Sequence, residues 1–260
     1  MLDFAIQTAR DAGRILAERF GRASLKVTQK GEIDLVTEAD LASERLIVER
    51  IRSYYPRHAI LTEEAGDVAR EERASEGASD YKWIVDPLDG TTNYAHGYPC
   101  FCVSIGLEYK NELLLGVVYD PIHDEMFAAE RGGGATLNGR ACRVSAVEDL
   151  NRALLCTGFP YDVRERNDFA RHFVHFIMHA QGVRRDGSAA LDMAYVACGR
   201  FEGFYEEGLQ PWDVAAAAVI VEEAGGRVSR YDGSPVSIYT PPIMASNGLV
   251  HEAMMRVLAM

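Results

Sequence analysis

The stretch WIVDPLDGTTN, residues 83–93, decides the fold, because an apolar strand leads directly into two carboxylates three residues apart. Pro87 has no N–H group and fixes its own φ, so we expect it to end sheet pairing and to turn Asp86 and Asp89 toward the same side. Gly90 lets the backbone approach a ligand closely, and its N–H group and that of the next residue can line an anion pocket. The stretch therefore predicts a site for hard cations and phosphate at the end of a buried strand.

The pair Asp89-Gly90 has a simpler alternative. Taken alone, this dipeptide between apolar runs favours a plain type I′ hairpin turn. A plain turn has no use for a second Asp, for a Pro between the two carboxylates, or for the sequence TTN where a strand should begin. The complete stretch therefore favours the cation and phosphate site over the hairpin.

Size and charge limit the classes of protein to consider. With 260 residues, 48% of them hydrophobic, the chain can bury a large core and forms one big domain or two closely joined lobes. The formal net charge of -12 and the lack of a dense Lys/Arg cluster argue against a nucleic-acid partner. An acidic protein that binds phosphate needs cations, which agrees with the predicted site.

Neither a targeting segment nor a disulfide framework is expected. The N-terminus shows no basic segment followed by a long apolar one, and no apolar run approaches the ~20 residues needed to cross a bilayer. We therefore expect a cytoplasmic protein without a membrane partner. The five cysteines are odd in number and form no CxxC pair, which favours reduced thiols.

Hydrophobic spacing predicts two helices at the start of the chain, at residues 2–20 and about 38–55, the second ended by Pro56. Thr37 and Asp40 fit a capping box at the start of the second helix, and this holds even if Asp40 is also catalytic. Four apolar residues are expected to face inward from that helix: Leu41, Ile47, Val48 and Ile51.

Antiparallel strands are predicted next. Alternating residues at 101–109 and 113–119 indicate a hairpin around Lys110-Asn111, followed by a strand at 126–129 and a tight turn at Asn138-Gly139. The triple glycine at 132–134 lacks the GxGxxG spacing of a dinucleotide loop, so it is assigned to a hairpin connection.

After about residue 147 the pattern changes to strands alternating with helices. The expected elements lie at 154–157, 168–180, 188–198, 203–206 and 212–224. We therefore expect an α+β lobe over residues 1–146, which carries the cation motif, and an α/β lobe over 147–260 that completes the site. Residues 67–80 lack an apolar face, so they are expected to form a mobile loop that gates the site.

Two further carboxylates lie at the ends of predicted elements. Glu63 follows the apolar run 59–61, and Asp213 opens a helix predicted at 214–224. Glu63 also fits a solvated edge charge, and Asp213 also fits a helix N-cap. Mg²⁺ prefers oxygen ligands and keeps substrate phosphate oxygens in its shell, so carboxylates at the ends of several elements suit it well.

Some charged residues have more than one interpretation. His172, His175 and His179 share a predicted helix and imitate a zinc site, but no nearby Cys or acid completes a ligand set. The pair Arg184-Arg185 fits a phosphate contact and a solvated strand end equally well. Zinc is therefore disfavoured, and the role of the arginine pair stays open.

Five stretches together resemble the inositol monophosphatase family, in its bacterial branch. They are DLVTEAD at 34–40, ILTEE at 60–64, WIVDPLDGTTN at 83–93, GSAA at 187–190, and PWD at 211–213 with its helix through EAGG at 223–226. Their order and spacing also match, and the resemblance covers essentially the whole chain.

The resemblance implies an α/β fold of the αβαβα sandwich type found in the sugar-phosphatase superfamily, usually as a homodimer. It implies two or three Mg²⁺ ions held by Glu63, Asp86, the carbonyl of Leu88, Asp89 and Asp213. Substrate positions would be Asp89, Gly90, Thr91, Ser188, Ala189 and Glu206. Catalytic positions would be Asp40, Thr91 and Glu63, with Thr91 and Asp40 orienting and deprotonating a water that attacks phosphorus in line.

The implied activity is the hydrolysis of inositol monophosphate or a similar small polyol or sugar phosphate, with sensitivity to Li⁺. Related enzymes that cleave fructose bisphosphate or adenosine bisphosphate nucleotides stay open as alternatives, as does a regulatory or scaffolding dimer that retains the site. Asp186 stands where many relatives carry Thr, and this extra anion beside the polyol pocket leaves the natural substrate open.

Overall fold

The computed structural model describes the whole chain apart from residues 22–26, 30–34, 68–78, 160–167 and 241. Most of the predicted gating loop at 67–80 therefore lies outside the described residues. No helix in the described part of the chain is both long enough and apolar enough to cross a membrane. All five cysteines are free thiols.

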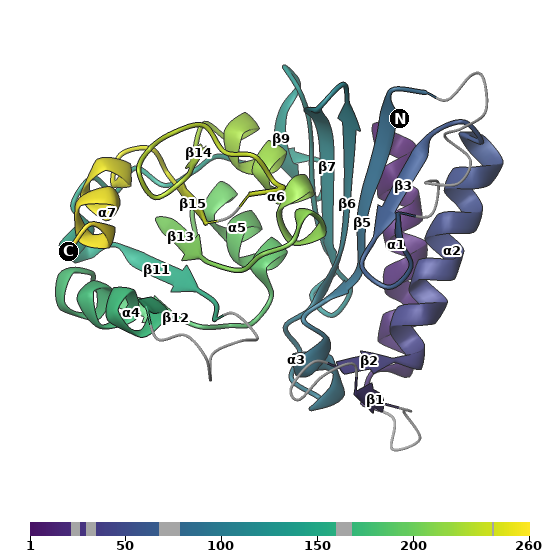
Figure 1. The fold of residues 1–260 in the computed structure, drawn as a ribbon, viewed down its shortest axis with the longest axis horizontal. Helices are drawn as coiled ribbons and strands as arrows, with labels where there is room; N and C mark the ends of the chain where they lie inside the picture. The colour runs from purple at the N-terminus through teal and green to yellow at the C-terminus, as the bar shows by residue number, and fades with distance from the viewer. Residues whose placement is uncertain (22–26, 30–34, 68–78, 160–167, 241) are drawn as a thin grey trace.

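Five layers of alternating helices and sheets make up the fold (Figure 1). Helices α1 (Leu2–Arg19) and α2 (Glu38–Tyr54) cover the outer face of an eight-stranded sheet. Helices α5 (Ala189–Ala197) and α6 (Pro211–Glu223) lie between this sheet and a five-stranded one. Helices α4 (Asp168–His179) and α7 (His251–Leu258) form the last layer. This arrangement confirms the αβαβα sandwich.

The eight-stranded sheet has the order β10-β9-β8-β7-β6-β5-β3-β4, and only the β3–β5 pair is parallel. Its strands are β3 (Ala59–Thr62), β4 (Gly66–Asp67), β5 (Tyr81–Asp89), β6 (Cys102–Tyr109), β7 (Glu112–Asp120), β8 (Glu125–Glu130), β9 (Gly134–Leu137) and β10 (Arg140–Ala141).

The five-stranded sheet has the order β12-β11-β13-β15-β14 and is parallel only from β12 to β13. Its strands are β11 (Leu154–Thr157), β12 (Gly182–Arg184), β13 (Gly203–Glu206), β14 (Arg227–Ser229) and β15 (Ile243–Ser246). The remaining short elements are β1 (Val27–Gln29), β2 (Leu35–Thr37), α3 (Thr91–Ala95) and the 3₁₀ helix Leu150–Arg152.

The predicted hairpins are confirmed. Lys110 and Asn111 have φ of 51° and 66°, and Asn138 and Gly139 have φ of 50° and 74°, as the two central residues of a type I′ turn require. Gly132 and Gly133 lie in the turn between β8 and β9, and Gly134 begins β9, so the assignment of the triple glycine to a hairpin connection is also confirmed.

The inward face predicted for α2 is wrong at its first turn. Leu41 is 50% exposed, whereas Ile47 and Ile51 are fully buried. The buried stripe begins instead with Ala39, Asp40 and Ser43, because this end of the helix faces a polar site as well as the apolar core.

Pro87 interrupts sheet pairing without ending it. Strand β5 continues to Asp89, and its register against β6 changes between Asp86, which faces Ser104, and Asp89, which faces Cys102. One extra residue on β5 therefore forms a bulge. A bulge re-aims side chains, and here it is followed by Gly90 at φ 97°.

The core crosses the proposed boundary between the two lobes. Buried side chains of the first sheet, among them Ile84 and Phe127, belong to the same cluster as the apolar residues of α5 and α6. Helix α6 packs so closely that a Cβ at Gly116 would overlap the backbone of Ala216. The division at residue 146 stays a prediction, with the halves sharing one core.

Candidate active site

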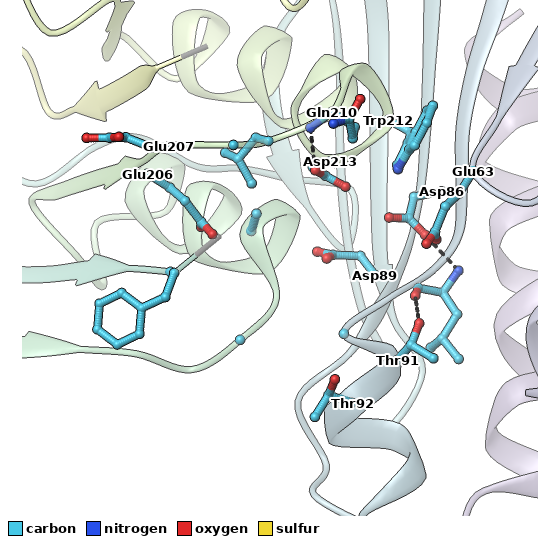
Figure 2. Close-up of a pocket in the computed structure, with 18 of the residues that line it drawn as sticks. Glu63, Asp86, Asp89, Thr91, Thr92, Glu206, Glu207, Gln210, Trp212 and Asp213 are labelled. Atoms are coloured by element: carbon cyan, nitrogen blue, oxygen red, sulfur yellow. Dashed lines mark hydrogen bonds between the residues drawn. The ribbon is translucent and has the colours of Figure 1, made fainter. Parts of the chain in front are cut away.

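Three chain segments converge at one edge of the eight-stranded sheet. Strands β3 and β5 run parallel, so their carboxyl ends meet there and bring Glu63 next to Asp86. The start of α6 supplies Asp213 from the opposite side, and Figure 2 shows the carboxylates of Asp86, Asp89 and Asp213 turned toward a common space. The predicted convergence of these acids is therefore present in the structure.

The cluster is tight and buried. One carboxylate oxygen each of Asp86, Asp89 and Asp213 lies within 4.8 Å of the other two. Asp86 is 2% exposed and Asp89 is 8% exposed. The bulge holds Asp86 in place, since the Leu88 N–H donates to its Oδ1 at 3.0 Å and Ser43 Oγ donates to the Pro87 carbonyl at 2.8 Å.

Asp89 is held from the C-terminal half of the chain. Its Oδ2 accepts from Ser188 Oγ at 2.6 Å and from the Ala190 N–H at 2.8 Å. Ser188 is 1% exposed and lies behind Asp89, so it orients the carboxylate, whereas its neighbour Ala189 lines the cavity.

Asp213 is not the N-cap of α6, as one alternative proposed. The helix begins at Pro211 with Gln210 as N-cap, and the Gln210 N–H donates to Asp213 Oδ2 at 2.7 Å. Asp213 is thus the third residue of the helix and part of its capping box. Pro at the first helical position was the sequence signal for this earlier start.

The pKa values show that the cluster repels itself. Burial raises the pKa of Asp86 well above its ordinary range, and the charges of Glu63, Asp89 and Asp213 raise it further. The pKa of Asp213 is raised in the same way, by burial and then by Asp89. Burial also raises the pKa of Asp89, against the hydrogen bonds from Ser188 and Ala190. Hard cations with oxygen preference would relieve this repulsion, so the donor set fits Mg²⁺.

Thr91 connects the cavity to a second carboxylate. Its Oγ lies 3.1 Å from Asp40 Oδ1 and 3.0 Å from the Leu88 carbonyl oxygen. Because the hydroxyl has one proton, it donates a hydrogen bond to one of these two acceptors at a time. Asp40 is fully buried, and its Oδ2 accepts the Thr37 N–H at 2.9 Å, which confirms the predicted capping box. Burial raises the pKa of Asp40, while the Thr37 contacts act in the opposite direction.

The cavity has a volume of about 570 Å³ and extends from the acidic cluster to the C-terminal half. Glu206 and Glu207 lie on the side away from Asp86 and Glu63 (Figure 2). Burial raises the pKa of Glu206 to about 8, with the charge of Arg185 opposing the rise. A Cβ at Gly158 would overlap the Glu206 carboxylate, so a glycine is needed to leave that carboxylate room.

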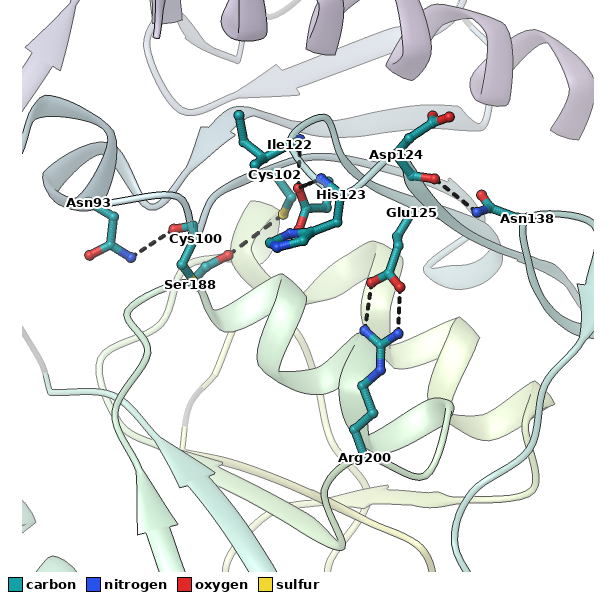
Figure 3. Close-up of polar contacts among 11 residues, drawn as sticks. Asn93, Cys100, Cys102, Ile122, His123, Asp124, Glu125, Asn138, Ser188 and Arg200 are labelled. Atoms are coloured by element: carbon teal, nitrogen blue, oxygen red, sulfur yellow. Dashed lines mark hydrogen bonds and ion pairs between the residues drawn. The ribbon is translucent and has the colours of Figure 1, made fainter. Parts of the chain in front are cut away.

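Several residues of this cavity were not found from the sequence. Gly158, Phe159, Glu207 and Gln210 line it without any local motif, because they meet only through the packing of distant strands and loops. Asn93 joins the two sides, since its Nδ2 donates to the Cys100 carbonyl at 2.7 Å (Figure 3) and to the Asp186 carbonyl at the same distance.

The structure also places the histidines and the arginine pair that had more than one interpretation from the sequence. No potential cation cluster among the described residues includes a histidine. The sequence indicated no acid near these histidines, yet His172 Nδ1 lies 3.3 Å from Glu207 Oε1. Of the arginine pair, Arg185 lines the cavity, and Arg184 is exposed with its Nη1 3.4 Å from the Val183 carbonyl.

Comparison with known families adds a decisive observation. Residues 1–259 match the inositol monophosphatase family. The chain belongs to this family. It is 44% identical over 260 residues to an inositol-1-monophosphatase of Synechocystis, covering 99% of this chain and 88% of that protein. It is also 44% identical over 259 residues to the Nus factor SuhB of Pseudomonas aeruginosa, covering 98% of this chain and 94% of that one.

Solved structures of the family agree with the fold. The extragenic suppressor protein SuhB of Bartonella henselae superposes with a TM-score of 0.92 at 39% identity, covering 98% of this chain and 97% of that chain. The inositol monophosphatase of Anabaena gives 0.88 at 46% identity, covering 99% and 94%. Membership supports a metal-dependent phosphatase, while the two kinds of name leave the specific activity open.

Proposed function

We propose that this inositol monophosphatase family member is a Mg²⁺-dependent phosphomonoesterase that hydrolyses inositol monophosphate or a similar small polyol or sugar phosphate. The observation that carries the proposal is the cluster of Asp86, Asp89 and Asp213 beside the Thr91–Asp40 pair, at one end of a 570 Å³ cavity. A cluster of carboxylates serves cation binding, and a buried hydroxyl–carboxylate pair beside it serves proton transfer.

Glu63, Asp86, Asp89, Asp213 and the Leu88 carbonyl would hold the cations. Bound Mg²⁺ supplies Lewis-acid chemistry there, which eases the ionisation of a water and stabilises the charge on the leaving oxygen.

The Thr91–Asp40 pair removes a proton from the attacking water. Thr91 Oγ accepts the proton of a water in the cavity, while its own proton passes to Asp40 Oδ1 at 3.1 Å. The raised pKa of Asp40 makes this carboxylate a better base than an ordinary, solvated aspartate. Because Asp40 is fully buried, the proton reaches it through the Thr91 hydroxyl.

Backbone N–H groups at the start of α3 hold the phosphate. The first hydrogen bond of this helix runs from the Tyr94 N–H to the Gly90 carbonyl at 3.0 Å, so the N–H groups before it stay available to an anion. On the far side of the cavity, Glu206 keeps its proton at neutral pH because its pKa is about 8, and it can donate to or accept from a polyol hydroxyl.

Phosphate release with and without Mg²⁺ tests this proposal. The substrates are inositol 1-phosphate, fructose 1,6-bisphosphate, histidinol phosphate and adenosine 3′,5′-bisphosphate. We expect turnover that requires Mg²⁺, favours inositol 1-phosphate and falls with millimolar Li⁺. Release that is unaffected by EDTA would contradict the cation site, and a preference for either bisphosphate would select the alternative enzyme class.

A regulatory role is a second candidate, because relatives at 42–44% identity carry the name Nus factor. In that role a regulatory or scaffolding homodimer in the cytoplasm would contact a partner protein and would not need the Thr91 hydroxyl. Sedimentation analysis measures whether the protein forms a dimer. A Thr91→Ala allele that replaces the chromosomal copy separates the two functions, since only the catalytic one is lost.

A further inference from the structure

Arg185 is the one basic side chain among the described residues that line the cavity. It follows β12 directly and faces a cavity that six acids also line: Glu63, Asp86, Asp89, Glu206, Glu207 and Asp213. Its neighbour Arg184 does not line the cavity, although both side chains are exposed. Of the two, only Arg185 therefore reaches the site.

An aromatic ring holds the Arg185 guanidinium. Its Cζ lies 5.6 Å from the ring centre of Phe159, a cation–π contact. Phe159 is itself anchored on α4, where its ring centre lies 5.1 Å from that of Phe169 and 5.6 Å from that of Phe173. This contact restrains the guanidinium through its face and leaves its in-plane N–H donors for another partner.

The backbone also makes room for this side chain. Gly187 has φ 89°, and a Cβ there would lie 3.0 Å from Arg185 Nη1 and 3.1 Å from Asn93 Nδ2. A side chain at Gly187 would require the guanidinium to shift by a few tenths of an ångström. The glycine that leads into α5 thus helps to position Arg185 as well as the Ser188 contact with Asp89.

Within the described residues, Arg185 makes no hydrogen bond and no ion pair, although acids surround the same cavity. The acid on which its charge acts most directly is Glu206, and the raised pKa of that group keeps it mostly protonated at neutral pH. An arginine that is positioned but not neutralised suits an anion supplied by a ligand, because its planar fork can donate two parallel hydrogen bonds to a carboxylate or a phosphate.

We propose that Arg185 binds a second anionic group of the substrate, so that the protein also accepts phosphomonoesters whose alcohol part carries a carboxylate or another phosphate. The inference rests on the proposed function and specifies its substrate class. Cations at the acidic cluster neutralise the phosphate to be cleaved, and Arg185 neutralises the second group at the other end of the cavity. A neutral polyol phosphate leaves this guanidinium unused.

Two matched pairs of compounds test the proposal. Glycerol 2-phosphate and 2-phosphoglycerate differ by one carboxylate, and inositol 1-phosphate and inositol 1,4-bisphosphate differ by one phosphate. For each pair, the kcat/KM of the compound with the additional anionic group is divided by the kcat/KM of the compound without it. This ratio is measured in the wild-type protein and in Arg185→Gln, Arg185→Lys and Arg184→Gln. We expect Arg185→Gln to lower the ratio of at least one pair about tenfold, which is a loss of one charged contact.

The controls separate this role from a structural one. Arg185→Lys should recover part of the ratio because it keeps the charge, and Arg184→Gln should keep the wild-type ratio. A fall in only one pair identifies carboxylate or phosphate as the second group. Equal ratios in Arg185→Gln and Arg184→Gln for both pairs would overturn the proposal.

A binding measurement keeps this test independent of turnover. If the wild-type protein releases phosphate from none of the four compounds, the proposed function fails. The rise in Tm that each compound causes with Mg²⁺ present then decides the role of Arg185. A larger rise with the doubly anionic member of a pair, lost in Arg185→Gln and kept in Arg184→Gln, supports the anion contact; rises that do not depend on Arg185 reject it.

Discussion

The acidic cluster predicts that Asp213→Asn stabilises the cation-free protein. At 4.8 Å, the largest separation of the three oxygens, two ionised carboxylates repel by about 3.5 kcal/mol at an effective dielectric constant of about 20. Protonation reduces this repulsion, because the raised pKa values of Asp86 and Asp213 let the site shed charge by keeping protons. We expect a gain of about 1 kcal/mol, or about 2–4 °C in Tm.

The hydrogen bond that caps the start of α6 is retained in Asp213→Asn. The oxygen of an asparagine at position 213 still accepts the Gln210 N–H that now reaches Asp213 Oδ2 at 2.7 Å. Mg²⁺ should reverse the order of stability. At ~100 times the dissociation constant, binding to the folded wild-type protein contributes roughly 2.7 kcal/mol, or about 5–10 °C, and the variant should show less than half of this rise.

Thermal melts at pH 7.5 and constant ionic strength, with Mg²⁺ titrated into each protein, measure both effects. Asp149→Asn is the matched control, because Asp149 also caps a helical turn, accepts the Asn151 N–H at 3.0 Å and lies outside the cavity lining. It should show the wild-type Mg²⁺ shift. An equal shift in Asp213→Asn would mean that Asp213 is only a helix cap, and a lower cation-free Tm would refute the electrostatic argument.

Three further changes probe other parts of the site. Thr91→Ala should lower kcat ~10²-fold or more and keep the Mg²⁺-induced Tm rise, with Thr92→Ala as the control that keeps turnover; near-normal kcat in Thr91→Ala would reject the proton relay. Glu206 has its folded pKa raised from 4.5 to about 8, so the folded state binds the extra proton and stability falls as pH rises through that window. Glu206→Gln should remove up to about 3.5 kcal/mol of this fall in cation-free unfolding measured from pH 5 to 8, and an unchanged pH profile would contradict the assignment. Gly158→Ala should displace the Glu206 carboxylate and raise KM at a stability loss of about 1–3 kcal/mol, whereas wild-type kinetics would show that the position of this carboxylate is not needed.

Local chemistry explains what the sequence alone could predict. The type I′ turns at Lys110-Asn111 and Asn138-Gly139 depend on residues that tolerate positive φ, and the Thr37–Asp40 box depends on a fixed spacing. The carboxylates at the ends of β3 and β5 were predicted for the same reason, since a strand end is marked by its own residues. Each of these signals is contained within a few consecutive positions.

The features that escaped prediction depend on partners distant in the sequence. Leu41 sits at apolar spacing, yet it is exposed because Asp40 and Ser43 take the inward face beside the site. The bulge after Asp86 is defined only by its pairing with β6. The position of Arg185 required Phe159, which α4 holds in place. The spacing of apolar and polar residues along one segment does not reveal such contacts.

The acidic cluster exists only when both halves of the chain are folded together. Asp86 is fixed by the bulge of β5 and by Ser43 of α2, whereas Asp89 is fixed by Ser188 and the start of α5, about a hundred residues away in sequence. In the unfolded chain these carboxylates separate, regain water and lose their mutual repulsion. The protein therefore carries an electrostatic penalty in its folded state that cations relieve, and that protons relieve in part when cations are absent. Any contact that draws α5 toward β5 strengthens cation binding, and bound cations stabilise the packing of the two halves by the same free energy.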